Sequence, residues 1–158
     1  ANDLLVADSS SGMFVTVFYG VLDVREGVFT YANAGHNPPL LARAGASAPE
    51  LLTAEGMILG VMEDIDLEEK QIRIAEGDVL LMYTDGLTDA INAHEEEFGA
   101  DRLARCLVDA TDRPAEDLIQ HVDREVAAHV GGQPQFDDYT LVAVKRTRPG
   151  ADPGNLPS

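Results

Sequence analysis

The chain has 158 residues, 45% of them hydrophobic, so it can bury one sizeable core, and a single domain is expected. Its 28 acidic and 11 basic residues give a net charge of −17, which argues against a nucleic-acid partner, because phosphate backbones are bound by clustered Lys and Arg. No apolar stretch is long enough to span a bilayer, so we expect a soluble protein without membrane insertion.

The first third of the chain has the pattern of a helix end followed by a β-hairpin. Residues 1–7 have the composition of the last turns of a helix. Residues 14–22 are aromatic or β-branched nearly throughout, which predicts a strand that is covered on both faces. The turn-forming residues 23–27 then lead into residues 28–32 as the second arm of a hairpin.

Strand signals continue through the middle of the chain. We expect residues 40–43 and 50–52 to form short strands around a loop. Ile72 and Ile74 alternate with polar residues, which is typical of a half-buried strand. The apolar run 79–83 predicts a further strand after a tight turn.

The helical signals come late in the chain. Apolar residues at helical spacing predict a helix over 100–111, with Cys106 on its apolar stripe and therefore in the core. A second helix is expected to begin near Pro114 and to end at the Gly131-Gly132 pair. A last strand follows at 139–144. Together, the predicted strands and helices indicate an α+β domain in which a helix pair covers antiparallel strands.

The two ends of the chain set the expected boundaries of the domain. We expect the ordered domain to cover residues 1–146 and the Pro/Gly-rich residues 147–158 to form a disordered tail. The single cysteine cannot form an internal disulfide, which fits a cytoplasmic location. Because residue 1 is Ala rather than Met, we expect the chain to be part of a longer protein.

Two aspartate turns stand at the ends of the last two predicted strands. The strand at 79–83 runs into Thr84-Asp85-Gly86, and Asp137-Asp138 leads into the strand at 139–144. A carboxylate at the end of a buried strand is held rigidly, and rigid carboxylates suit hard cations such as magnesium or manganese. The pair therefore predicts an oxygen-ligand metal centre, which is suited to phosphate chemistry.

The first of these turns is not the nucleophile loop of a haloacid-dehalogenase-type phosphatase. That loop needs a second aspartate two residues before Asp85, where this chain has Tyr83. Water activated by divalent cations needs no protein nucleophile, so a metal-dependent mechanism remains open.

Four segments in register carry a family resemblance. They are GMFVTVFYG at 12–20, YANAGHNPPLL at 31–41, YTDGLTDA at 83–90 and DDYTL at 137–141. Together they resemble the protein phosphatase 2C-like (PPM) superfamily, and within it the bacterial SpoIIE/RsbU branch. The segment EEFG at 96–99, followed by an amphipathic helix, is also similar to that branch.

The resemblance implies an antiparallel β-sandwich flanked by helices. It also implies a centre of two Mn²⁺ or Mg²⁺ ions that hydrolyses phosphoserine or phosphothreonine on proteins through an activated water. By the same resemblance, Asp85 and Asp137 bind one of these ions. Asp89 matches a carboxylate that in some relatives helps to hold a third, looser metal, and Asp138 is adjacent support. His36 stands where those relatives carry Asp, so a structural role and a role at an additional metal or substrate site are both open.

One part of the family pattern does not occur in this chain. The family's first metal ligand comes from an Asp-Gly motif in an early strand, followed by helices. We therefore expect this chain to be the C-terminal portion of a phosphatase domain that lacks the N-terminal strand and helices. Alone, it should bind metal weakly, turn over little, and self-associate as a homo-oligomer through exposed sheet edges.

Two functions from different classes remain open. The first is a Mn- or Mg-dependent protein phosphatase whose substrate, in this branch, is a phosphorylated anti-sigma-factor antagonist. The second is a non-catalytic regulatory or protein-binding module that kept the phosphatase fold. An Asp-Gly motif upstream of residue 1 would favour the enzyme.

Overall fold

The computed structural model describes residues 2–8, 12–133 and 137–147. Of the tail expected at 147–158, residues 148–158 lie outside these ranges. The chain forms two compact units. Unit 1 comprises Ala1–Pro38 and Leu52–Arg73, and unit 2 comprises Pro39–Leu51 and Ile74–Ser158.

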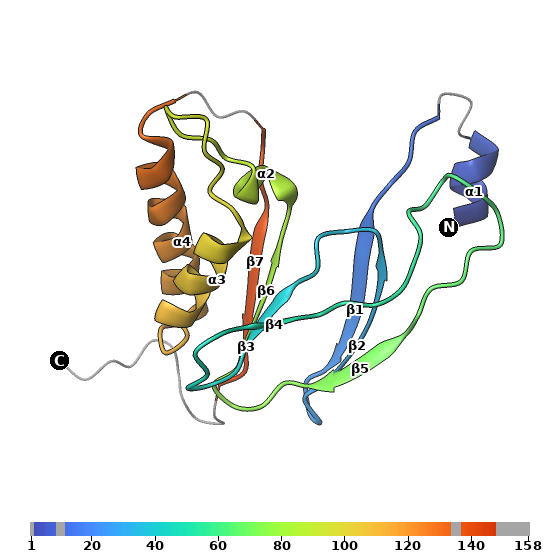
Figure 1. The fold of residues 1–158 in the computed structure, drawn as a ribbon. Helices are drawn as coiled ribbons and strands as arrows, with labels where there is room; N and C mark the ends of the chain where they lie inside the picture. Colours follow the sequence, from blue (N-terminus) through green and yellow to red (C-terminus); the bar gives the residue numbers. More distant parts are fainter. Residues whose placement is uncertain (1, 9–11, 134–136, 148–158) are drawn as a thin grey trace. The chain divides into compact units, whose positions relative to one another are not determined.

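Unit 1 is built on a three-stranded antiparallel sheet in the order β1-β2-β5. Its elements are α1 (Asn2–Asp8), β1 (Val17–Asp23), β2 (Val28–Ala34) and β5 (Lys70–Arg73), which are visible in Figure 1. The predicted helix end, the hairpin and the half-buried strand at β5 are confirmed. The hairpin turn is closed by Asp23, whose Oδ1 accepts the backbone N–H groups of Arg25 (2.9 Å) and Glu26 (3.0 Å).

The expectation of a first strand covered on both faces is wrong. β1 begins at Val17 rather than at residue 14, and Tyr19 and Val21 are 66% and 54% exposed. In the described residues β1 pairs along its length with β2 only, and none of its residues is buried. An unbroken run of β-branched and aromatic residues does not distinguish such a strand from one buried on both faces.

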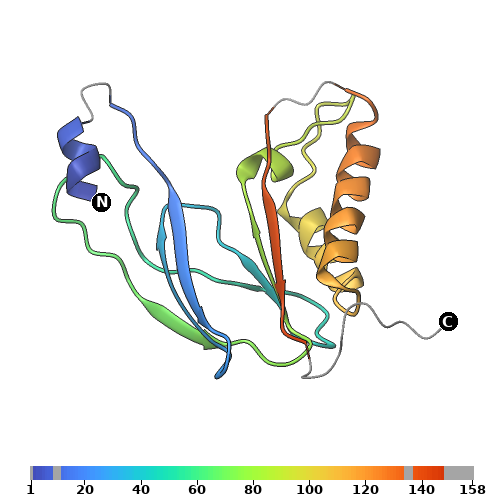
Figure 2. The same cartoon turned by 180° about the vertical axis from the view of Figure 1, so that it is seen from behind.

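Unit 2 is built on a four-stranded antiparallel sheet in the order β4-β3-β6-β7. Its strands are β3 (Leu40–Ala42), β4 (Glu50–Leu51), β6 (Val79–Tyr83) and β7 (Leu141–Lys145), and its helices are α2 (Asp85–Thr88), α3 (Ala100–Asp109) and α4 (Ala115–Val130). The views from opposite sides in Figures 1 and 2 show α3 and α4 together on one side of β6 and β7. The predicted α+β class with antiparallel strands and a covering helix pair is confirmed.

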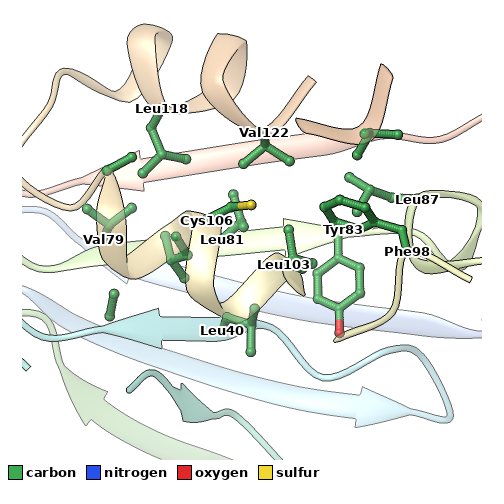
Figure 3. Close-up of a cluster of buried hydrophobic side chains, with 14 residues drawn as sticks. Leu40, Val79, Leu81, Tyr83, Leu87, Phe98, Leu103, Cys106, Leu118 and Val122 are labelled. Atoms are coloured by element: carbon green, nitrogen blue, oxygen red, sulfur yellow. The ribbon is translucent and has the colours of Figure 1, made fainter. Parts of the chain in front are cut away.

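The core of unit 2 lies between this helix pair and the sheet (Figure 3). Leu118 and Val122 recur at helical spacing on α4 and are fully buried, and Leu103 of α3 and Leu81 of β6 are buried with them. Cys106 is buried in the same cluster, as predicted. α4 ends at Val130 and is capped by Gly131, whose φ of 61° is the left-handed conformation that glycine adopts at low cost.

A buried carboxylate anchors the start of β6. Asp78 is 2% exposed and accepts hydrogen bonds from the backbone N–H of Ala44 (3.0 Å) and Ala75 (2.9 Å) and from the guanidinium of Arg43 (2.9 Å). Burial raises the pKa of Asp78, but these hydrogen bonds outweigh it and leave the pKa below its ordinary value. These hydrogen bonds therefore hold in place the start of β6, the strand that leads to the first aspartate turn.

Within the described residues, the helices are all too short or too polar to cross a lipid bilayer.

Candidate metal centre

The pairing of β6 with β7 brings the two aspartate turns to the same end of the sheet, where β6 ends and β7 begins. Tyr83 and Leu141 are the last pair of this antiparallel ladder. Beyond them, the N–H of Thr84 donates to the carbonyl of Thr140 at 3.1 Å, and the N–H of Thr140 donates to Oγ1 of Thr84 at 2.8 Å. The chain leaving β6 and the chain entering β7 are therefore held side by side where each aspartate turn begins.

The first turn, α2, is a single turn of helix that begins at Asp85. The carbonyl of Asp85 accepts the N–H of Asp89 at 2.8 Å, which closes the turn. The hydroxyl of Thr88 lies 3.0 Å from the same carbonyl and 3.2 Å from Oδ1 of Asp89, so it can donate its proton to either. Asp85 and Asp89 stand at the two ends of this turn with exposed side chains.

The two turns approach each other closely at Gly86. A Cβ atom at this position would lie 2.6 Å from the carbonyl oxygen of Asp138 and 3.5 Å from Cβ of Asp137. A contact of 2.6 Å with a backbone atom is too short for any residue other than glycine. Gly86 is therefore needed for close approach rather than for an unusual backbone angle.

Asp85 and Asp137 are predicted to bind the same ion. The backbone N–H of the following residue orients each of these carboxylates. Oδ1 of Asp85 accepts the N–H of Gly86 at 3.0 Å, and Oδ1 of Asp137 accepts the N–H of Asp138 at 2.8 Å. Both carboxylates are exposed, so cations in solution can reach them.

Asp85, Asp89 and Asp137 line one cavity of about 350 Å³. The other described residues that line it are Gly86, Ala90, Ile91, Val126, Ala127, Val130, Gly132, Gln133 and Tyr139. No Lys, Arg or His is among these described lining residues, so the described lining side chains carry a net negative charge.

This donor set fits a hard divalent cation, because carboxylate oxygens are the ligands that Mg²⁺ and Mn²⁺ prefer. It is not a complete metal site. Across the described part of the chain, no group of three or more His, Cys, Asp or Glu side chains converges closely enough to hold a metal ion. The three carboxylates share the cavity without meeting at one point, so a cation there would need further ligands.

The remaining predicted site residues are placed differently. Asp138 contributes its backbone, which contacts Gly86, and its side chain is not among the described lining residues. His36 belongs to unit 1, in a turn closed by Asn33, whose side chain accepts the His36 N–H at 2.8 Å and donates to the His36 carbonyl at 2.9 Å. Nδ1 of His36 lies 3.1 Å from Oγ1 of Thr16. The two Asn33 contacts use the backbone of His36 and the Thr16 contact uses its imidazole, and both a structural role and a role at a metal or substrate site stay predictions for this side chain.

Part of the cavity wall was not predicted from the sequence. Val126, Ala127 and Val130 come from the last turns of α4, where the repeat of apolar residues indicated only a core-facing stripe. Tyr139 lines the same wall and donates its hydroxyl to Oδ1 of Asp123 at 3.0 Å. Burial, and then this hydrogen bond, raise the pKa of Tyr139. The apolar repeat of α4 carries no separate signal for the cavity, because Val126 lies in the core of unit 2 and Val130 packs against it.

Comparison of the sequence with known proteins gives consistent matches. A family model described as stage II sporulation protein E (SpoIIE) matches residues 1–147. The protein IcfG of Synechocystis sp. is 33% identical over 146 residues, which are 92% of this chain and 23% of IcfG. The phosphoserine phosphatase RsbU of Bacillus subtilis is 24% identical over 145 residues, which are 92% of this chain and 43% of RsbU. The chain thus spans less than half the length of these relatives.

Solved structures share the fold. The SiaA-PP2C domain of Pseudomonas aeruginosa superposes with a TM-score of 0.77 at 20% identity, covering 90% of this chain and 57% of that domain. The manganese-presoaked phosphatase domain of SpoIIE from Bacillus subtilis gives a TM-score of 0.63 at 17% identity, covering 90% of this chain and 59% of that one. The predicted phosphatase-type fold is confirmed by this similarity.

Proposed function

This chain belongs to the SpoIIE family of PP2C-type (PPM) serine/threonine phosphatase domains, and from that premise we propose that it contributes the Asp85–Asp137 side of a cation-dependent phosphatase centre. The observation that carries the proposal is the charge of the cavity. Three carboxylates line it, and its described lining residues include no basic side chain. A phosphate monoester is itself anionic, so it can bind beside these carboxylates only if cations offset the repulsion.

Asp85 and Asp137 are the residues that would hold such a cation, with Asp89 as an additional oxygen donor. When bound, Mn²⁺ or Mg²⁺ ions would neutralise charge on the phosphoryl group and lower the pKa of a water molecule. The protein's own residues hold the donors in position. The hydrogen bonds between Thr84 and Thr140 fix the strand ends, and Gly86 lets the two turns approach.

The proposed reaction is hydrolysis of phosphoserine or phosphothreonine on a protein. RsbU, one of the relatives, is named a phosphoserine phosphatase. By membership of the same branch, the substrate we propose is a phosphorylated anti-sigma-factor antagonist. A cytoplasmic location belongs to the same proposal, and the free, buried thiol of Cys106 is consistent with it.

Residues 1–158 alone should bind a cation weakly and turn over little. The reason is the donor set, because the described residues bring no three ligand side chains to one point. This incompleteness also favours a second candidate function, a non-catalytic binding or regulatory module. Such a module would fold normally and show no cation-dependent turnover in its natural full-length form.

The proposal is tested by phosphatase assays on the natural full-length protein with Mn²⁺, using p-nitrophenyl phosphate and a phosphoserine peptide. We expect Asp85→Asn and Asp137→Asn each to lower kcat/KM by about 100-fold or more, because each removes a carboxylate that would hold the cation, and the cation would stabilise the charge of the transition state. Asp101→Asn, an exposed acidic residue in the first turn of α3, is the matched control and should have little effect. Turnover without any divalent cation, or full activity of both site variants, would contradict the proposal. Folded protein without any turnover would favour the module.

A further inference from the structure

The segment that carries Asp137 into β7 is fixed to β6 on one side. The N–H of Thr84 donates to the carbonyl of Thr140 at 3.1 Å, and the N–H of Thr140 donates to Oγ1 of Thr84 at 2.8 Å. These two bonds hold the backbone at residue 140, three residues after Asp137. Helix α4 packs against β7, as Figures 1 and 2 show, so the segment can also be held from the helix.

Tyr139 makes the contact between this segment and α4. Its ring is partly buried and packs against the core of unit 2, and its hydroxyl donates to Oδ1 of Asp123 at 3.0 Å. A hydrogen bond to an ionised carboxylate is stronger than one between neutral groups. Burial, and then this hydrogen bond, raise the pKa of Tyr139, so the hydroxyl keeps its proton and stays a donor.

Asp123 is a rigid point of attachment, because its neighbours on α4 are in the core. Leu118 and Val122 are fully buried, and Val126 is 3% exposed. Close packing around these three side chains holds the middle of the helix in place. A hydrogen bond to Asp123 therefore fixes the position of Tyr139 relative to the helix.

The position of Tyr139 bears directly on that of Asp137. Both residues line the same cavity, and they are two positions apart in the chain. Two residues span at most about 7 Å, so a displacement of Tyr139 is passed on to Asp137 with little slack. Between them, the carbonyl of Asp138 lies against Gly86, which limits movement of the segment towards α2.

We infer that Tyr139, through its hydrogen bond to Asp123, is a positioning residue for Asp137. It holds residues 137–140 against α4, so that the Asp137 carboxylate stays at the cavity. The inference rests on the proposed cation-dependent function and deepens it, because it gives α4 a part in the centre although the described lining residues from α4 include no acidic side chain. Loss of the Tyr139 hydroxyl should weaken cation binding and leave the chemistry with bound cation unchanged.

The test compares Tyr139→Phe with Tyr31→Phe in the natural full-length protein. Tyr31 is the matched control, because its hydroxyl also has a single partner given by the structure, the carbonyl of Thr53 at 3.4 Å, but lies in unit 1. We expect Tyr139→Phe to raise the Mn²⁺ concentration for half-maximal turnover of p-nitrophenyl phosphate by about fivefold. Its kcat at saturating Mn²⁺ should stay within about twofold of the unmodified value, since excess cation compensates for weaker binding. Tyr31→Phe should change neither quantity.

Two substitutions of Asp123 show whether the hydrogen bond is responsible. Asp123→Asn keeps an oxygen that can accept the Tyr139 hydroxyl, so the Mn²⁺ requirement should stay within about twofold of the unmodified value. Asp123→Leu has a similar size without an acceptor and should reproduce the effect of Tyr139→Phe. The double variant Tyr139→Phe/Asp123→Leu should be no worse than either single variant, because both remove the same interaction.

Hydrogen exchange in the absence of Mn²⁺ gives a readout that does not depend on activity. Amides of residues 137–141, followed by mass spectrometry, should exchange faster in Tyr139→Phe and Asp123→Leu than in the unmodified protein or Asp123→Asn. Equal Mn²⁺ requirements in Tyr139→Phe and Tyr31→Phe, a loss of kcat that Mn²⁺ does not restore, or unchanged exchange at 137–141 would overturn the inference. Absence of Mn²⁺-dependent turnover in the unmodified protein would instead overturn the proposed function, and exchange at 137–141 would then decide whether Tyr139 fixes this segment.

Discussion

At the scale of single residues, Asp78 is the only acidic residue that is buried in the described part of the chain. It is buried, and both of its oxygens accept hydrogen bonds, from two backbone N–H groups and one guanidinium. Asparagine would keep its shape but would turn an NH₂ group towards N–H donors. The arrangement is therefore specific for an ionised carboxylate.

We predict that Asp78→Asn lowers the free energy of unfolding by about 3 kcal/mol at pH 7, because buried donors lose their acceptor. The effect should depend on pH. The pKa of Asp78 in the folded protein lies below its ordinary value, so its stabilisation is complete above the ordinary aspartate pKa of about 4. It is lost as the pH falls through the lowered folded-state value. Urea unfolding at pH 7 and at pH 3 measures both effects.

The control for this prediction is Asp66→Asn, at an exposed position, which should change stability by less than about 0.5 kcal/mol. A difference between Asp78→Asn and the unmodified protein that stays constant from pH 7 to pH 3 would show that the carboxylate charge is not what stabilises the start of β6.

At the scale of elements, the site depends on how two strand ends meet. The antiparallel register of β6 and β7 brings Tyr83 opposite Leu141, and the turns beyond this pair touch at Gly86. The separation of Asp85 from Asp137 is thus set by the strand ladder and by the absence of a side chain at Gly86.

We predict that Gly86→Ala weakens cation binding at this site by about tenfold or more, since its Cβ would force the backbone of Asp138 away. Overpacking of this kind also destabilises, typically by about 1–3 kcal/mol. Gly45→Ala is the control, because Gly45 has a φ of 76° and a Cβ added there would meet no atom within 4 Å, so alanine strains only the local backbone. Mn²⁺ titrations of both variants, followed by paramagnetic broadening of the amide signals of residues 85–90, separate the two effects, and equal cation affinities in the two would contradict the close-approach argument.

The sequence predicted most elements of the fold because each carried a local signal. The helical spacing of Leu103 and Cys106, the glycine at the end of α4 and the alternation at β5 were sufficient. The first strand was the exception. Whether Tyr19 and Val21 are covered depends on which strands lie beside β1 and not on the residues themselves.

The candidate site was predictable only in part, for the same reason. Asp85 and Asp137 were identified because each stands at a strand end beside residues with turn chemistry. The close contact at Gly86 and the use of Ala127 in a cavity wall depend on tertiary packing, which no local pattern encodes. Binding of cations by Asp85, Asp89 and Asp137 stays a prediction, as does self-association through sheet edges.

At the scale of the whole molecule, the net charge of −17 complicates any test of cation binding. Divalent ions will collect around an acidic surface whether or not it contains a defined site. Residues 63–69 of unit 1 alone include five acidic side chains. Bulk binding curves therefore cannot distinguish a centre at the aspartate turns from a diffuse ion atmosphere, and the measurement must report position.

The most direct test is paramagnetic broadening of assigned amide NMR signals on addition of substoichiometric Mn²⁺ to this chain. A cation held between the aspartate turns predicts that the signals of residues 85–90 and 137–139 broaden before those of residues 63–69. The double variant Asp85→Asn/Asp137→Asn should abolish this selectivity while its spectrum stays that of a folded protein. Broadening that follows the acidic surface at 63–69, or that is unchanged in the double variant, would contradict the account.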